Sequence, residues 1–247
     1  MPTIRSEHER EHFDKLASNI GEAWWGHLTP AGKVRLQRRA SIIKDQLKTI
    51  TNPHILEIGC GAGALSKYIL DVLPPCQLTC CDISPQSLEI AKNRCAQHTN
   101  ASFDCADVTQ LPYPDDSYDA IVGNSILHHV VLGESIKECF RLLRKGGSIL
   151  FFEPNMLNPQ VAIEKNIKFI GRMTQNSADE TAFFRWPLAK ELSQQGFINV
   201  NVRPFDFLHP IVPRTLIDVS KKISFILEKT PLLKEISGSL IITAYKK

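Results

Sequence analysis

The chain has 247 residues, 43% hydrophobic and 22% charged, which is the composition of a globular protein able to bury one large core. Its 29 Lys and Arg residues against 26 Asp and Glu residues leave a formal charge of +3, too small to indicate nucleic acid or an anionic membrane as a partner. Seven cysteines without a CxxC pair exclude the commonest zinc and redox signatures, so we expect no metal and a reducing, cytoplasmic setting.

The first 50 residues predict two helices. Residues 6–20 indicate a short polar helix, without the apolar stretch of a signal peptide. Thr29 and Pro30 then form an N-cap and first-turn pair. Apolar residues recur at spacings of three and four, which predicts an amphipathic helix over residues 30–50: Leu36, Ala40, Ile43, Leu47 and Ile50. Its basic residues are mixed with Gln and Asp and lack interleaved aromatic residues, which favours a solvated face over a nucleic-acid site.

Strands and helices alternate over residues 54–154. Short apolar strands are expected at residues 54–59, 77–83, 101–107, 118–125 and 148–154, with helices at 64–73, 85–97 and 133–143. This order is typical of parallel βαβ units. The predicted fold class is therefore α/β, a doubly wound, Rossmann-like sheet in a single domain whose cofactor-binding core is residues 54–154.

The regular alternation ends after Pro154. A helix at residues 188–196 and strands at 197–205 and 239–247 are separated by two long segments, 155–187 and 207–237. Both are too long for plain connections, so we expect a helical lid or cap. A helix over about 214–228 carries Leu216, Val219, Ile223, Ile226 and Leu227 near one face. Packing of that face on the domain is favoured; a lid for a greasy substrate or a membrane-surface contact is left open.

The first strand ends in a glycine-rich turn, Leu-Glu-Ile-Gly-Cys-Gly-Ala-Gly at residues 56–63. Gly59 and Gly61 permit a sharp turn and a close ligand, and Gly63 lets the next helix start against the strand. The helix N-terminus adds unpaired N–H groups. Residues 59–64 also fit G-x-G-x-x-A, so a dinucleotide remains an alternative at this point.

Three carboxylates end the first three strands: Glu57, Asp82 and Asp107. Ligands of such sheets bind beyond the carboxyl ends of the strands. Asp82 lies about twenty residues past the glycines, the spacing for a carboxylate that binds ribose hydroxyls. Asp107 is placed to reach an adenine amino group and Ile83 to cover the adenine ring. Glu57 would serve a pyrophosphate poorly but suits a cationic ligand such as S-adenosylmethionine.

Four successive segments resemble the motifs of the class I S-adenosylmethionine-dependent methyltransferases, most closely the small-molecule branch that includes the ubiquinone and menaquinone methyltransferases. They are ILEIGCGAG, CCDISPQSLEIAK, ADVTQLPYPDDSYDAIVGNSILHHV and LLRKGGSILFFEP. The resemblance covers residues 54–154 strongly and the terminal strands weakly. It implies a seven-stranded sheet whose last strand is antiparallel to the others.

By position, the resemblance implies a role in cofactor binding for each of several residues. The turn residues Gly59, Cys60, Gly61 and Gly63 would line the methionine part, Asp82 would hold the ribose, and Asp107 and Val108 would frame the adenine, while Asn124 and Ser125 would border the sulfonium and its methyl group. Segments 1–50, 155–187 and 207–237 vary in this family, so substrate choice is expected there.

Methyl transfer is an in-line displacement that needs alignment and exclusion of water, and a base only if the acceptor loses a proton. His128 and His129 follow the fourth strand, and at most one of these adjacent residues can face the site. Glu153 and Arg185 are candidates for binding the substrate, with a backbone hydrogen bond and a solvated position as their alternatives.

The sequence thus predicts methyl transfer from S-adenosylmethionine to a small-molecule or lipid-like acceptor, with oxygen or carbon slightly favoured over nitrogen. No nucleic-acid partner is expected, and a peripheral membrane contact is not favoured. An RNA or protein methyltransferase and a nucleotide-binding protein without methyltransferase activity remain the alternatives. The oligomeric state is left undetermined.

Overall fold

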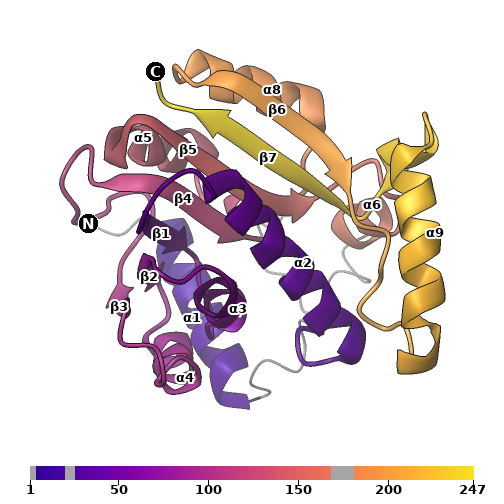
Figure 1. Cartoon of the computed structure of the whole chain (residues 1–247), viewed down its shortest axis with the longest axis horizontal. Coiled ribbons are helices and arrows are strands. Elements are labelled where there is room, and N and C mark those ends of the chain that lie inside the picture. Colours follow the sequence, from indigo (N-terminus) through magenta and orange to yellow (C-terminus); the bar gives the residue numbers. More distant parts are fainter. Residues whose placement is uncertain (1–3, 20–25, 168–180) are drawn as a thin grey trace.

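A single seven-stranded sheet organises the computed structural model, which describes residues 4–19, 26–167 and 181–247. The strands are β1 His54–Ile58, β2 Gln77–Asp82, β3 Ala101–Cys105, β4 Tyr118–Asn124, β5 Leu143–Pro154, β6 Ile198–Phe205 and β7 Ser239–Tyr245. Their order across the sheet is β3-β2-β1-β4-β5-β7-β6 (Figure 1). The first five strands pair in parallel, and β7 is antiparallel to β5 and β6, which confirms the expected architecture.

Helices cover both faces of this sheet. They are α1 Ile4–Asn19, α2 Pro30–Leu47, α3 Ala64–Val72, α4 Pro85–Arg94, α5 Leu132–Leu142, α6 Pro159–Asn166, α8 Arg185–Gln194 and α9 Ile217–Lys229, with short 3-10 turns at Leu127–His129, Arg214–Leu216 and Leu233–Ile236. Apolar residues of α2, α3 and α4 pack on one face, and those of α5 and α8 on the other. The neighbours Cys80 and Cys81 belong to opposite layers, as the two-residue period of a strand requires.

Two predicted helix starts are present as capped N-termini. The Thr29 hydroxyl accepts a hydrogen bond from the Gly32 N–H, and the Ser84 hydroxyl accepts one from the Ser87 N–H. Proline follows each cap at the first helical position. These local signals fix where α2 and α4 begin, and hence how the loop before α4 meets the end of β2.

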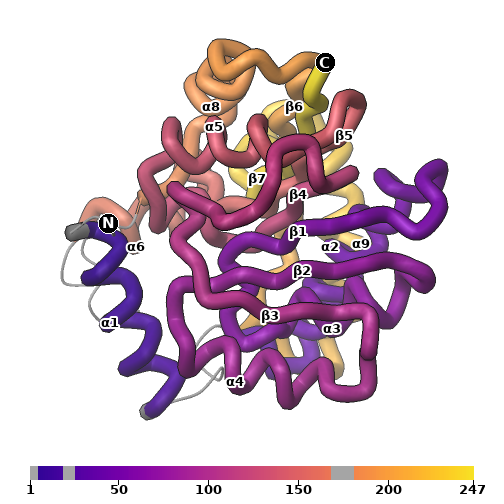
Figure 2. The backbone as a smooth tube through the Cα atoms, turned by 90° about the vertical axis from the view of Figure 1, so that its left-hand side faces the viewer, coloured from indigo at the N-terminus to yellow at the C-terminus, as the bar shows by residue number. Residues whose placement is uncertain are grey.

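The strand order reverses between β1 and β4. The chain leaves β1 toward β2 and β3 on one side and returns to β4 on the other, so a crevice opens at the carboxyl ends of these neighbours. Figure 2 shows α1 lying across that end of the strands, beside α4 and outside the sheet. The fold therefore places the predicted glycine turn and strand-end carboxylates under an N-terminal helix.

Helix α9 packs with a different face from the one we favoured. Its buried residues are Ile217 and Ser224, and the Ser224 hydroxyl accepts a hydrogen bond from the Phe207 N–H. The predicted apolar face is exposed instead: the exposed fractions are 53% for Leu216, 55% for Val219, 51% for Ile223 and 62% for Ile226. The expected packing of this face on the domain is therefore wrong. Its contact with a membrane surface stays a prediction, and none of the described helices is long and apolar enough to span a membrane.

Candidate active site

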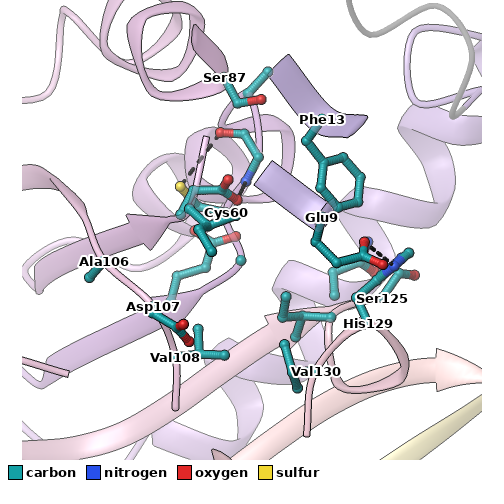
Figure 3. A pocket seen from close by; sticks show the side chains of 18 of the residues that line it. Glu9, Phe13, Cys60, Ser87, Ala106, Asp107, Val108, Ser125, His129 and Val130 are labelled. Carbon is teal, nitrogen blue, oxygen red and sulfur yellow. Dashed lines mark hydrogen bonds and ion pairs between the residues drawn. The ribbon is translucent and has the colours of Figure 1, made fainter. Parts of the chain in front are cut away.

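A deep cavity lies at the carboxyl ends of β1, β2 and β4 (Figure 3). Its empty volume is about 1230 Å³ with the open solvent at its mouth included. The predicted cofactor residues that line it are Glu57, Gly59, Cys60, Gly61, Asp82, Ile83, Asp107, Val108, Asn124 and Ser125. Gly63 lies outside the lining.

The glycine turn has the left-handed backbone that its residues predict. Gly59, Gly61 and Gly63 have φ angles of 63°, 52° and 75°. A Cβ on Gly59 would lie 2.5 Å from the Ile126 side chain, and one on Gly63 would lie 3.0 Å from Ala91 of α4. A Cβ on Gly61 would meet nothing within 4 Å. Gly59 and Gly63 are thus required by packing and conformation, and Gly61 borders open space in the cavity.

Two carboxylates are held by backbone N–H groups at this edge. Asp82 accepts hydrogen bonds from Gly61 N at 2.7 Å and from Ser84 N at 2.9 Å. Burial raises the pKa of Asp82, and these hydrogen bonds oppose the rise. Asp107 Oδ1 accepts bonds from the Thr109 N–H and hydroxyl at 2.9 and 2.7 Å. Both side chains are oriented before any ligand enters.

Glu57 is a buried carboxyl group that forms no ion pair with the described residues. Its exposed fraction is 1%, and the Cys80 thiol lies 3.7 Å from its Oε2 atom. Burial raises the pKa of Glu57 to about 7. A cationic group in the cavity would stabilise the ionised form, so this wall of the site favours positive charge in a ligand.

Cys60 lines the cavity as a neutral thiol. The hydrogen bond with Cys80 and burial raise the pKa of Cys60 well above its ordinary value. A thiol that stays protonated is a poor nucleophile. Cys60 can therefore contact a ligand but is not suited to covalent chemistry.

The two adjacent histidines have different positions. His129 lines the cavity, and its Nδ1 atom lies 3.1 Å from Glu9 Oε2 (Figure 3). His128 lies outside the lining, with its Nδ1 atom 2.6 Å from Glu153 Oε2. Only His129 is therefore placed to act on a ligand.

Glu153 is not among the residues that line the cavity. It is 1% exposed, and its Oε1 atom accepts hydrogen bonds from the N–H groups of Ile126 at 2.9 Å and Leu127 at 2.8 Å. The backbone hydrogen bonds expected as the alternative for Glu153 are present, and its role toward a substrate stays a prediction. Glu153 positions that turn, and with it the backbone of His129.

Arg185 is also absent from the lining. Its guanidinium pairs with Glu235, with 3.0 Å between Arg185 Nε and Glu235 Oε2. The described parts of segments 155–187 and 207–237 contribute no residue to the described cavity wall, and their role as a lid or cap stays a prediction. Residues 168–180 lie outside the described residues. The substrate role predicted for Arg185 is therefore not supported by its position.

Helix α1 supplies a wall that sequence reasoning missed. Glu9, Phe13 and four further α1 residues line the cavity: Arg5, Ser6, Leu16 and Ala17. The Phe13 and His129 rings meet edge to face with centroids 5.2 Å apart, and Arg5 donates to the carbonyls of His128 and His129. The only sequence signal is the spacing of Phe13 and Leu16 in an otherwise polar helix, too weak to predict its position.

Comparison with known proteins agrees with this geometry. The family described as a methyltransferase domain matches residues 55–147. A ubiquinone biosynthesis O-methyltransferase of Coxiella burnetii is 30% identical over 150 residues, which cover 58% of this chain and 61% of the relative. A malonyl-[acyl-carrier protein] O-methyltransferase of Paenibacillus is 37% identical over 112 residues, covering 42% and 41%. The chain thus spans less than two thirds of the relatives that it matches.

Among solved structures, the fold is similar to that of a SAM-dependent methyltransferase from Thermotoga maritima, titled as a "possible histamine N-methyltransferase". The TM-score is 0.67 at 17% identity, covering 96% of this chain and 99% of the other. Identity this low supports the fold alone. Residues 55–147, which the methyltransferase family matches, include the glycine turn, Asp82, Asp107 and the turn that carries His129.

Proposed function

We propose methyl transfer from S-adenosylmethionine to a small-molecule acceptor as the function of this chain, which carries a methyltransferase domain of the class I, S-adenosylmethionine-dependent family. The observation that carries the proposal is a single cavity that joins the glycine turn and Asp82 to His129. The part of the cavity formed by the glycine turn and Asp82 suits an adenosine-containing cofactor, and the part formed by His129 holds an imidazole able to accept a proton.

The donor set of the cavity fits the cofactor. Glu57 is an uncompensated buried carboxyl group, which a cationic amino-acid end would stabilise. Asp82 is fixed by backbone N–H groups and would bind the ribose hydroxyls. Asp107 keeps its Oδ2 atom for an adenine amino group, and Ile83 and Val108 would cover the ring. When bound, S-adenosylmethionine supplies a methyl carbon already activated by its sulfonium.

His129 is proposed to accept the proton of the acceptor. Glu9 fixes the imidazole through Nδ1 at 3.1 Å, so proton exchange with an acceptor hydroxyl would use Nε2. With S-adenosylmethionine bound, transfer of its methyl group to the acceptor oxygen would break the carbon–sulfur bond and release S-adenosylhomocysteine, and His129 would take the proton that the acceptor loses. Helix α1 contributes Phe13 and Leu16 to the wall, which excludes water from this proton transfer.

An oxygen or carbon acceptor is the finer part of the proposal. The relatives quoted above are O-methyltransferases by name, and a base beside the cavity suits a phenol, a carboxylic acid or an acidic carbon. Apolar lining from Ile126, Val130 and Val131 favours acceptors with a hydrophobic part. We propose a panel of phenols and malonyl thioesters as the first acceptors to assay.

Titration calorimetry with S-adenosylhomocysteine, NAD and NADP tests the cofactor. We expect micromolar binding of S-adenosylhomocysteine alone, lost in Asp82→Ala. Binding of NAD in its place would overturn the proposal and support a nucleotide-dependent oxidoreductase on the same fold. Transfer of a labelled methyl group to RNA or protein, with none to small molecules, would support the RNA or protein methyltransferase.

A further inference from the structure

Arg39 of α2 is a buried cation at the back of the cavity. Its exposed fraction is 4%, and its Nη1 atom donates to Asn124 Oδ1 at 2.6 Å. The Nη2 atom donates to the Ser239 hydroxyl at 3.3 Å and lies 3.6 Å from Asp206 Oδ2. Burial lowers the pKa of Arg39 to about 9, so the guanidinium keeps its charge near neutral pH.

The contact with Arg39 fixes the orientation of the Asn124 amide. A guanidinium has donors and no acceptor, so the Asn124 atom facing it must be the carbonyl oxygen. The amide nitrogen, Nδ2, then points away from Arg39. Asn124 lines the cavity, and its Nδ2 atom donates to no group of the described residues. The end of β4 therefore presents two N–H donors to a ligand.

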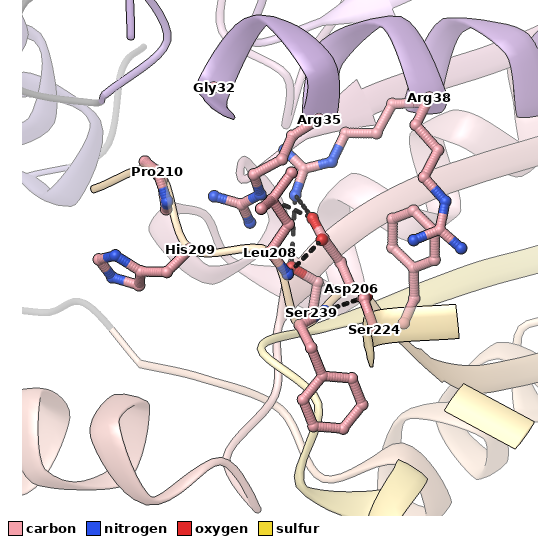
Figure 4. Close-up of polar contacts among 12 residues, drawn as sticks. Gly32, Arg35, Arg38, Asp206, Leu208, His209, Pro210, Ser224 and Ser239 are labelled. Carbon is pink, nitrogen blue, oxygen red and sulfur yellow. Dashed lines mark hydrogen bonds and ion pairs between the residues drawn. The ribbon is translucent and has the colours of Figure 1, made fainter. Parts of the chain in front are cut away.

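The surroundings of this amide carry positive charge. Arg35 and Asp206 are paired at 2.6 Å (Figure 4), whereas Arg38 is paired separately with Glu228 through two hydrogen bonds. Arg35 and Arg39 both lie beside Asp206, and Glu153 is a further carboxylate close enough to raise the pKa of Arg39. Burial, Arg39 and Arg35 together lower the pKa of His27, another lining residue. The guanidinium of Arg39 behind Asn124 and the N–H donors of the Asn124 amide both favour an anionic oxygen as the ligand atom there.

We propose that Arg39 is a positioning residue that holds Asn124 as a hydrogen-bond donor to a carboxylate of the bound ligand; this inference rests on the proposed function. The carboxylate has two sources, the amino-acid end of the cofactor or a carboxyl group on the acceptor. Glu57, on the neighbouring strand β1, suits the cationic part of the same ligand. Together the two strand ends would bind a zwitterion.

Binding measurements on the full chain test the proposal through two pairs of probes. S-adenosylhomocysteine carries the amino-acid carboxylate, and 5′-methylthioadenosine lacks it. Malonyl-coenzyme A carries an acceptor carboxylate, and acetyl-coenzyme A lacks it; both are titrated in the presence of S-adenosylhomocysteine. Each pair is measured by calorimetry in the wild-type protein and in Arg39→Met, Arg39→Lys, Asn124→Asp and Arg38→Met.

If the bound carboxylate belongs to the cofactor, Arg39→Met and Asn124→Asp should weaken S-adenosylhomocysteine binding at least tenfold and leave the affinity for 5′-methylthioadenosine within twofold of the wild-type value. If it belongs to the acceptor, the two variants should weaken malonyl-coenzyme A binding by the same factor and leave acetyl-coenzyme A binding within twofold. Asn124→Asp keeps a partner for Arg39, so it folds if Arg39→Met does not. Arg39→Lys should restore part of the selectivity, and Arg38→Met, the matched loss of one cation, should not alter it.

Two outcomes overturn the inference. One is unchanged discrimination within both probe pairs in Arg39→Met and Asn124→Asp. The other is an equal loss for the two members of each pair, which indicates general damage to the site. Failure of the wild-type protein to bind S-adenosylhomocysteine is a different result, because it contradicts the proposed function itself.

Discussion

Single buried groups determine the chemistry of the cavity. Glu57 is one of them, and its burial costs free energy of folding once the carboxyl group ionises. The folded protein holds the Glu57 proton up to about pH 7, whereas the ordinary pKa is 4.5. The stability associated with the protonated group is therefore present below pH 4.5 and is lost as the pH rises to 7. The cost reaches roughly 3 kcal/mol, at about 1.4 kcal/mol per pKa unit.

Glu57→Gln removes this titration. Without bound ligand, we expect the free energy of unfolding of the variant, relative to that of the wild-type protein, to be larger at pH 8 than at pH 5. Urea denaturation at both pH values measures the gain, and Glu89→Gln, at an exposed position, serves as a surface control. An equal difference between Glu57→Gln and wild type at the two pH values would contradict the buried, protonated carboxyl group.

The adjacent histidines give a second prediction at this scale. His129→Ala should lower kcat by about 10²-fold or more and leave the affinity for S-adenosylhomocysteine nearly unchanged, because the imidazole acts only on the acceptor's proton. His128→Ala should act mainly on stability, since it removes the hydrogen-bond partner of the buried Glu153 Oε2 atom, at about 1–3 kcal/mol. Steady-state kinetics and thermal unfolding separate the effects. Full turnover in His129→Ala would exclude it as the base.

Helix α1 is the element that joins the two functional regions of the cavity. The Ser84 hydroxyl at the start of α4 donates to Asp14 Oδ1 at 2.6 Å, while Arg5 and Glu9 contact the turn after β4. The helix thus bridges the cofactor side and the proposed base. Its stability depends on these tertiary contacts, because a polar helix of this length is marginal alone.

Phe13→Ala tests this wall. Loss of the ring should weaken S-adenosylhomocysteine binding by about tenfold, mainly through faster dissociation, because the cover that Phe13 provides over the cavity is removed. Stopped-flow fluorescence measures the dissociation rate. Lys15→Ala, on the exposed face of α1, is the matched control and should bind as the wild-type protein does. Identical dissociation rates in Phe13→Ala and wild type would contradict the role of α1 as a wall.

Some elements of the structure could be predicted from the sequence and others could not, for physical reasons. Strands buried on both faces carry a continuous apolar signal, so the central strands and the strand-end carboxylates Glu57 and Asp82 were predictable. The use of a helix face depends on what packs against it, so the wall made by α1 and the exposed stripe of α9 were not. In α9, Ser224 faces inward because it binds the Phe207 N–H. For Glu153, the sequence left a substrate role and a backbone hydrogen bond both open, because the N–H groups that its Oε1 atom accepts from lie 27 and 26 residues earlier in the chain.

For the whole molecule, ligand binding and stability are linked. S-adenosylhomocysteine at 100 times its Kd should stabilise the fold by about 2.7 kcal/mol, which raises the Tm by roughly 5–10 °C for a chain of this size. Asp82→Ala should remove the shift at the same ligand concentration, and NAD should cause none in the wild-type protein. Differential scanning calorimetry measures all three. A Tm shift that persists in Asp82→Ala would place the ligand elsewhere.

The position of β7 has a consequence for biosynthesis. This strand lies between β5 and β6, so residues 239–245 occupy the interior of the sheet and supply hydrogen bonds to both neighbours. On the ribosome, β5 and β6 emerge first and have no partner for their facing edges until β7 leaves the exit tunnel. The nascent chain therefore exposes two strand edges with unpaired backbone groups for several seconds of translation. During that time chaperones that bind extended segments can bind them.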